Sequence, residues 1–89
     1  VGLLIAKSYA AMGDNDMARK SFDFVRELSG GFDVIAEYAI WAAERGDWPT
    51  AHRLKADADK AITHWSGQQR QLNREMLQRL KTAFAAQPK

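Results

Sequence analysis

Side chains able to carry out catalysis or bind a metal are few in this 89-residue chain, and their spacing does not group them. The two histidines, His52 and His64, are twelve positions apart and fall on different predicted elements. Cysteine is absent, which removes thiolate nucleophiles, thiolate metal ligands and disulfides. No serine lies in a nucleophile elbow, and Gly30-Gly31 is not part of a phosphate-binding loop. The sequence therefore predicts no enzymatic activity, no cofactor and no metal.

The acidic cluster Asp14-Asn15-Asp16 has a faint similarity to a calcium-binding loop. A calcium loop needs a bidentate glutamate eleven residues after its first aspartate, and Val25 stands there. Helix capping accounts for these acids better, because a carboxylate accepts bonds from the N–H groups at the start of a helix. The cluster is interpreted as part of a turn.

That turn belongs to a stretch that occurs twice. Gly13-Asp14-Asn15-Asp16-Met17-Ala18 is followed, thirty-three residues later, by Gly46-Asp47-Trp48-Pro49-Thr50-Ala51. Each glycine can end a helix in the left-handed conformation, and each aspartate can cap the next helix. Pro49 falls in a first helical turn, where its missing N–H does no harm. A period in the low thirties is typical of stacked helical hairpins.

Hydrophobic spacing predicts the helices that this turn connects. They cover residues 1–12, 15–28, 32–45 and 48–62, and a last amphipathic helix runs over 67–86. Leu4 and Ile5 are predicted to pack, whereas Glu37 and Glu44 are predicted to face water. Ser66 and Gln69 have the spacing of a capping box. One stripe at 3.6-residue spacing runs along the last helix: Leu72, Met76, Leu77, Leu80, Ala83 and Phe84.

The duplicated pattern resembles the tetratricopeptide repeat. The first copy supplies Ala6, Tyr9, Gly13, Asp14, Ala18, Phe22 and Val25, and the second supplies Ala39, Ala42, Gly46, Asp47, Trp48, Ala51 and Ala58. The resemblance implies an all-α, right-handed superhelix of antiparallel helical hairpins. Residues 1–31 and 32–63 would be the repeats, and residues 64–89 an amphipathic capping helix and tail. The chain begins without methionine and inside a repeat, so we expect it to come from a longer protein.

The resemblance also implies a function, which is binding of a protein or peptide partner as an adaptor or assembly module. In that family the first helix of each hairpin lines the concave binding surface. Trp41 could belong to this surface as an exposed aromatic, or it could pack against the last helix. Carried onto this chain, the surface comprises Leu3, Lys7, Ala10, Asp33, Ala36, Glu37, Ile40, Trp41 and Glu44.

Two other functions stay open. The apolar first helix, or the stripe of the last helix, could form a homodimer interface. The net charge of +2 is uneven: residues 1–63 carry −2 and residues 64–89 carry +4. Nucleic acid and membrane surfaces are weaker candidates as partners, because the basic residues of the last helix are few: Arg70, Arg74, Arg79 and Lys81. The absence of cysteine is compatible with both cytoplasm and periplasm.

Overall fold

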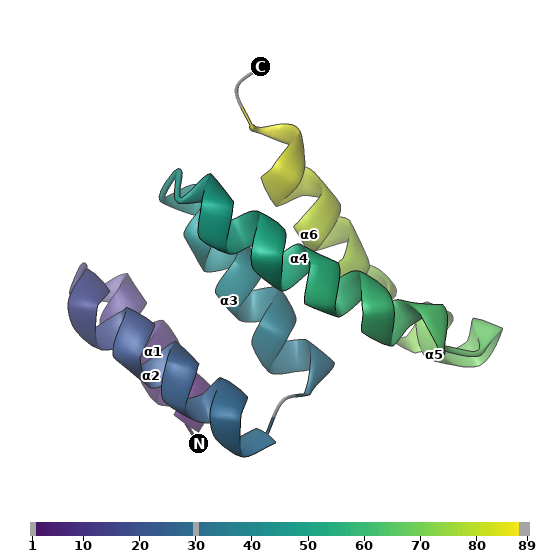
Figure 1. The fold of residues 1–89 in the computed structure, drawn as a ribbon, viewed down its shortest axis with the longest axis horizontal. Helices are drawn as coiled ribbons and strands as arrows, with labels where there is room; N and C mark the ends of the chain where they lie inside the picture. Colours follow the sequence, from purple (N-terminus) through teal and green to yellow (C-terminus); the bar gives the residue numbers. More distant parts are fainter. Residues whose placement is uncertain (1, 30, 88–89) are drawn as a thin grey trace. The chain divides into compact units, whose positions relative to one another are not determined.

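The structure, a computed structural model, describes residues 2–29 and 31–87. Their regular elements are all helices, as the sequence predicts (Figure 1). Gly30, in the break predicted after the second helix, lies outside the described residues, as do Val1, Pro88 and Lys89. The chain forms two compact units, Val1–Val34 and Ile35–Lys89. The helices are α1 (Gly2–Ala11), α2 (Asn15–Ser29), α3 (Phe32–Glu44), α4 (Trp48–Thr63), α5 (Gly67–Leu72) and α6 (Arg74–Ala85).

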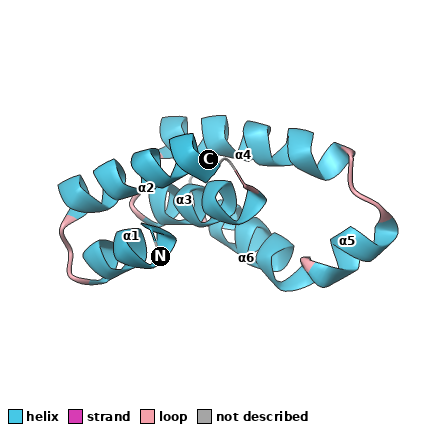
Figure 2. Ribbon diagram, turned by 90° about the horizontal axis from the view of Figure 1, so that it is seen from below, coloured by secondary structure: helices cyan, strands magenta, loops and turns pink. Residues whose placement is uncertain are grey.

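The first unit is a helical hairpin, in which α1 and α2 lie side by side (Figures 1 and 2). Its buried side chains are small on α1 and larger on α2. Ala6 and Ala18 are fully buried, and Phe22 is almost completely buried. A methyl side chain at Ala6 and Ala18 leaves little bulk between helix backbones, and Phe22 supplies most of the apolar volume.

The turns that close α1 and α3 have the same geometry. After α1, the Gly13 N–H donates to the Ala10 carbonyl (3.1 Å) and the Asp14 N–H to the Tyr9 carbonyl (3.0 Å). These two bonds define a Schellman motif, which requires a left-handed residue at Gly13, where φ is +80°.

Thirty-three residues later the same bonds recur after α3. The Gly46 N–H donates to Ala43 (3.0 Å) and the Asp47 N–H to Ala42 (2.9 Å), and Gly46 has φ +78°. The two sequence copies therefore fold into the same local structure. Three pairs of residues 33 apart are buried in both copies: Ala6 and Ala39, Ala18 and Ala51, Val25 and Ala58.

The aspartates of the two turns behave differently. The Asp14 carboxylate accepts a bond from the Met17 N–H (3.3 Å), which confirms the predicted cap on α2. The Asp47 side chain makes no capping bond to α4, so the prediction for Asp47 is wrong. Pro49, in the first turn of α4 as predicted, removes one N–H that a cap could have satisfied.

The second unit packs α6 against α3 and α4, with α5 joining α4 to α6 (Figures 1 and 2). The side of α4 that carries Ala51, Leu54 and Ala58 is buried, as the helical spacing predicts. On α6, Leu80 is the residue that is buried, and its neighbours on the stripe are half-buried.

The predicted last helix is divided in two at Asn73. Ser66 and Gln69 form the predicted capping box at the start of α5, with bonds of 3.0 and 3.2 Å. After the six residues of α5, Asn73 leaves helical geometry (φ −104°, ψ 17°), and its side-chain amide donates to the Gln69 carbonyl (2.9 Å). Because this break rotates α5 away from the stripe of α6, Leu72 is 77% exposed. The prediction of one continuous helix with Leu72 on its packed side is wrong.

The described helices include none that is long and apolar enough to cross a membrane.

Candidate functional site

The predicted concave surface draws its first three residues from α1. Lys7 is exposed, whereas Leu3 and Ala10 are half-buried. All three lie in the first unit. They are thus partly accessible, and their role in partner binding stays a prediction.

The remaining residues of that surface lie on α3 and are mostly covered. Ala36, Glu37, Ile40 and Trp41 are buried, and only Asp33 and Glu44 are exposed. The Trp41 ring packs against Tyr38, with 6.0 Å between ring centroids, and the Arg45 guanidinium lies 5.0 Å over it. Burial of Trp41 answers the question that the sequence left open about its exposure.

Glu37 departs most from its expected environment. The sequence predicts that it faces water, yet it is 6% exposed and forms an ion pair with Arg79 of α6. The Arg79 Nη1 to Glu37 Oε1 distance is 2.6 Å, and Arg79 Nη2 lies 3.5 Å from Oε2. A fork of two N–H donors facing two carboxylate oxygens fixes the direction as well as the distance of the contact. This pair connects α3 to α6 across 42 residues of sequence.

An aromatic cluster holds the other end of α6 on α4. The Phe84 ring meets Trp48 edge-on at 5.8 Å and His52 at 5.5 Å between ring centroids. The Lys55 ammonium lies 5.8 Å from the centre of the Phe84 ring and also pairs with Asp59 (3.1 Å). Edge-to-face rings and a cation over an aromatic face are both attractive. His52 therefore packs against aromatic rings on the surface of the unit.

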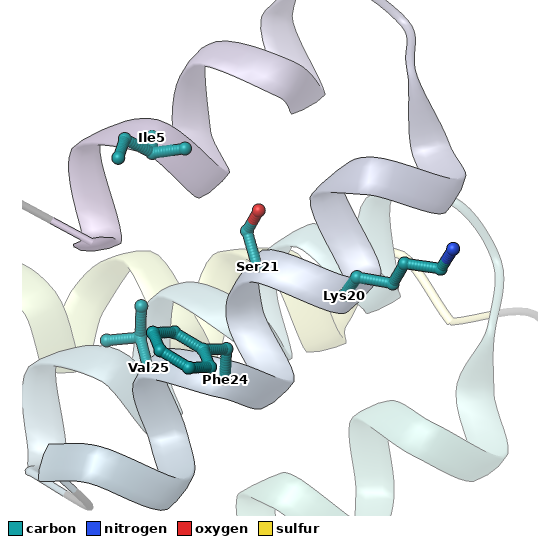
Figure 3. Close-up of a pocket in the computed structure, with 5 residues that line it drawn as sticks. All are labelled: Ile5, Lys20, Ser21, Phe24 and Val25. Atoms are coloured by element: carbon teal, nitrogen blue, oxygen red, sulfur yellow. The ribbon is translucent and has the colours of Figure 1, made fainter.

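Several large apolar side chains of the first unit are exposed. Ile5 of α1 and Phe24 of α2 line the same groove, of about 320 Å³, together with Lys20, Ser21 and Val25 (Figure 3). Leu4 adjoins Ile5 in sequence, and Leu28 lies one turn beyond Phe24. Their exposed fractions are large: 68% for Leu4, 48% for Ile5, 62% for Phe24 and 73% for Leu28. These four side chains are called the apolar face below.

Sequence reasoning missed the apolar face. It predicted packing for Leu4 and Ile5, which are both exposed. A signal was available, because Phe24 is two positions after Phe22 and two such residues cannot share one side of a helix. Phe22 is buried, so Phe24 must point elsewhere.

Some basic side chains of the C-terminal helices already make contacts within the chain. Arg79 pairs with Glu37, and Arg70 Nη2 donates to the Ile62 carbonyl (3.2 Å). Arg74 and Lys81 are exposed on α6. Binding of nucleic acid by this side stays a prediction. In the part of the chain that the structure describes, no three His, Asp or Glu side chains are grouped as metal ligands would be.

Comparisons with protein-family models, curated proteins and solved structures give no significant match for this chain.

Proposed function

We propose that this chain is a protein–protein interaction module, an adaptor or assembly domain of a larger protein, and that it binds its partner through the apolar face. One observation carries the proposal: four large apolar side chains are exposed on a single hairpin, and two of them, Ile5 and Phe24, line one groove. Exposed apolar surface of this kind marks sites where proteins associate, because leaving it in water costs free energy.

The repeated architecture supports the same proposal. Two identical helix-ending turns, 33 residues apart, and the matching burial of alanines are what tetratricopeptide-like hairpins would produce. We propose that the hairpins belong to a right-handed superhelix and that the C-terminal helices close it. Proteins built in this way bind partners on their extended surfaces.

The size of the expected effect follows from the exposed area. Burying a whole Phe or Leu side chain contributes about 1.5–3 kcal/mol, so covering the exposed majority of Phe24 and Leu28 contributes about 1–2 kcal/mol for each. One such side chain therefore accounts for about a tenfold change in affinity, since 1.4 kcal/mol is a factor of ten. Central aromatic residues usually contribute more than the rim of an interface.

The test is to capture proteins from the source extract on the immobilised chain and to measure the affinity of each purified candidate by calorimetry. We expect Phe24→Ser to weaken binding at least about tenfold, because it removes the largest side chain of the apolar face. The matched control is Leu72→Ser, which removes a side chain of even higher exposure on the other unit. We expect no change in affinity for that control. Equal affinity of the wild-type chain and Phe24→Ser for every candidate would contradict the proposal.

Self-association is the second candidate function, and the same surface favours it. The hairpin has a groove lined by Ile5 and Phe24 and also exposes Leu4 and Leu28, so two copies could each insert a side chain into the groove of the other. Contacts of this reciprocal kind are the usual basis of twofold dimers.

A further inference from the structure

The exposed apolar side of α2 has the spacing of a short coiled-coil seam. Met17, Ser21, Phe24 and Leu28 follow one another at intervals of four, three and four residues. In a heptad written abcdefg, Ser21 and Leu28 take a positions, and Met17 and Phe24 take d positions. Met17, Phe24 and Leu28 are exposed, and Ser21 is half-buried. These four residues are called the α2 seam.

The two flanks of the α2 seam differ in character. At the e positions, Ala18 and Val25 are buried, and Ile5 of α1 lines the groove together with Val25. At the g positions, Lys20 and Glu27 are exposed and carry opposite charges. Charges that flank a seam of this kind set which helices pair and in which direction.

We propose that a second copy of this chain occupies the apolar face, with the α2 helices of the two copies packed antiparallel along their α2 seams. The inference rests on the proposed role of the apolar face in binding, and it names the occupant. Antiparallel packing places a positions opposite d positions. Met17 then faces Leu28 of the second copy, Ser21 faces Phe24, and a twofold axis repeats both contacts.

The sizes of the facing side chains favour this direction. Phe24 is the largest residue of the α2 seam and Ser21 is the smallest, so each ring meets the position with the least bulk. Ser21 also lines the groove of about 320 Å³, which gives the ring a place to enter. Large residues opposite small ones let packed layers interdigitate. A parallel pair would instead place Phe24 against Phe24 and Ser21 against Ser21, which crowds one layer and leaves a gap in the next.

The charges favour the same direction. Antiparallel helices bring the g positions of both copies to one flank, so Lys20 of each copy faces Glu27 of the other. A parallel pair would place g positions beside e positions, where Ala18 and Val25 offer no charge. Each exposed ion pair contributes little free energy, so the α2 seam supplies most of the attraction and the ion pairs select the direction.

The experiment is a charge swap, read by sedimentation equilibrium at low salt, where exposed ion pairs are least screened. Lys20→Glu makes both facing pairs Glu with Glu, and Glu27→Lys makes both Lys with Lys. We expect each variant alone to dimerise about tenfold more weakly, because two attractions become two repulsions. An equimolar mixture of the two variants should dimerise as tightly as wild type, since each pair in a mixed dimer again joins a lysine to a glutamate.

The matched control is Lys60→Glu, the same charge change on an exposed lysine of α4, in the other unit. It should dimerise as wild type does. The chain that carries both Lys20→Glu and Glu27→Lys should also dimerise as wild type, because its pairs are only reversed. If circular dichroism shows that a single charge reversal has lost its helices, Lys20→Gln and Glu27→Gln replace the two variants. Each of these should weaken the dimer about threefold, because two attractions are lost without repulsion.

Three results would overturn the inference. They are a wild-type chain that stays monomeric at millimolar concentration, charge variants that dimerise as tightly as Lys60→Glu, and a mixture that dimerises no better than its separate components. None of these results bears on the proposed function, since Lys20 and Glu27 lie outside the apolar face. Failure of the proposed function would appear instead as equal partner binding by the wild-type chain and Phe24→Ser.

Discussion

Gly13 and Gly46 each have a backbone conformation that other residues adopt only at a cost. Both have positive φ, yet a side chain at either position would have nothing within 4 Å of its Cβ. Glycine is therefore required at these turns by the backbone angle and not by crowding. The Schellman bonds that follow each glycine depend on that angle.

We expect Gly13→Ala and Gly46→Ala each to lower the free energy of unfolding by about 1 kcal/mol, because left-handed geometry costs roughly 1–2 kcal/mol for a residue with a Cβ. Urea denaturation followed by circular dichroism measures this loss. If the copies are equivalent, the two substitutions should have similar effects.

Gly67→Ala is the matched control for the glycine substitutions. Gly67 starts α5, lacks the positive φ and also has open space around the position of a Cβ. Alanine there should leave stability unchanged or raise it slightly, because it reduces the freedom of the unfolded chain. A loss as large as that at Gly13 would show that the backbone angle is not the cause.

At the scale of the element, local sequence signals located the helices well. The glycines fixed the ends of α1 and α3, and Ser66 with Gln69 fixed the start of α5, because all three signals act within four residues. The break at Asn73 was missed because the apolar spacing continues across it. Asparagine is only a moderate helix breaker, and the bond that ends α5 uses its side chain.

The environment of Glu37 could not be predicted in the same way. Glutamate is normally exposed, so a helix position that carries it is expected to face water. The apolar run around Glu37, which is buried throughout residues 34–43, indicates burial but does not indicate which residue pairs with the carboxylate. Its partner Arg79 is 42 residues away. The pairing of Glu37 depends on where α6 packs, so it emerges only from the fold.

The capping box of α5 gives a prediction at this scale. We expect Ser66→Ala to lower the local stability of α5 by about 1 kcal/mol, which is typical for loss of a Ser cap. Because α5 has no buried residues, the cap is a large part of what keeps this segment helical. Hydrogen exchange at the amides of Gln69 and Arg70 should accelerate, with little change elsewhere.

Ser8→Ala is the control for the cap. Ser8 is exposed within α1, where alanine is the better helix former. Amide exchange in α5 should be unaffected by that change. Unchanged exchange at Gln69 in Ser66→Ala would refute the importance of the cap.

At the scale of the whole molecule, two surfaces are candidates for association with another molecule. The apolar face would associate by burying hydrocarbon, a contact that salt does not weaken. The basic side around Arg74 and Lys81 would associate with anions, a contact that weakens steeply with salt. Solution mass as a function of concentration and salt separates these possibilities.

We expect weak self-association of the 10.0 kDa chain, with a dissociation constant above roughly 10 µM, because four side chains per copy must offset an association cost of about 4–15 kcal/mol. Sedimentation equilibrium from dilute to millimolar chain should show a monomer–dimer equilibrium that persists when salt is raised. Phe24→Ser should leave only monomer, and Leu72→Ser should behave as wild type, since Leu72 is exposed but lies outside the apolar face. A dimer that survives Phe24→Ser, or one that salt dissociates, would remove the apolar face as the dimer interface. A chain that stays monomeric throughout would keep that face available for a different protein.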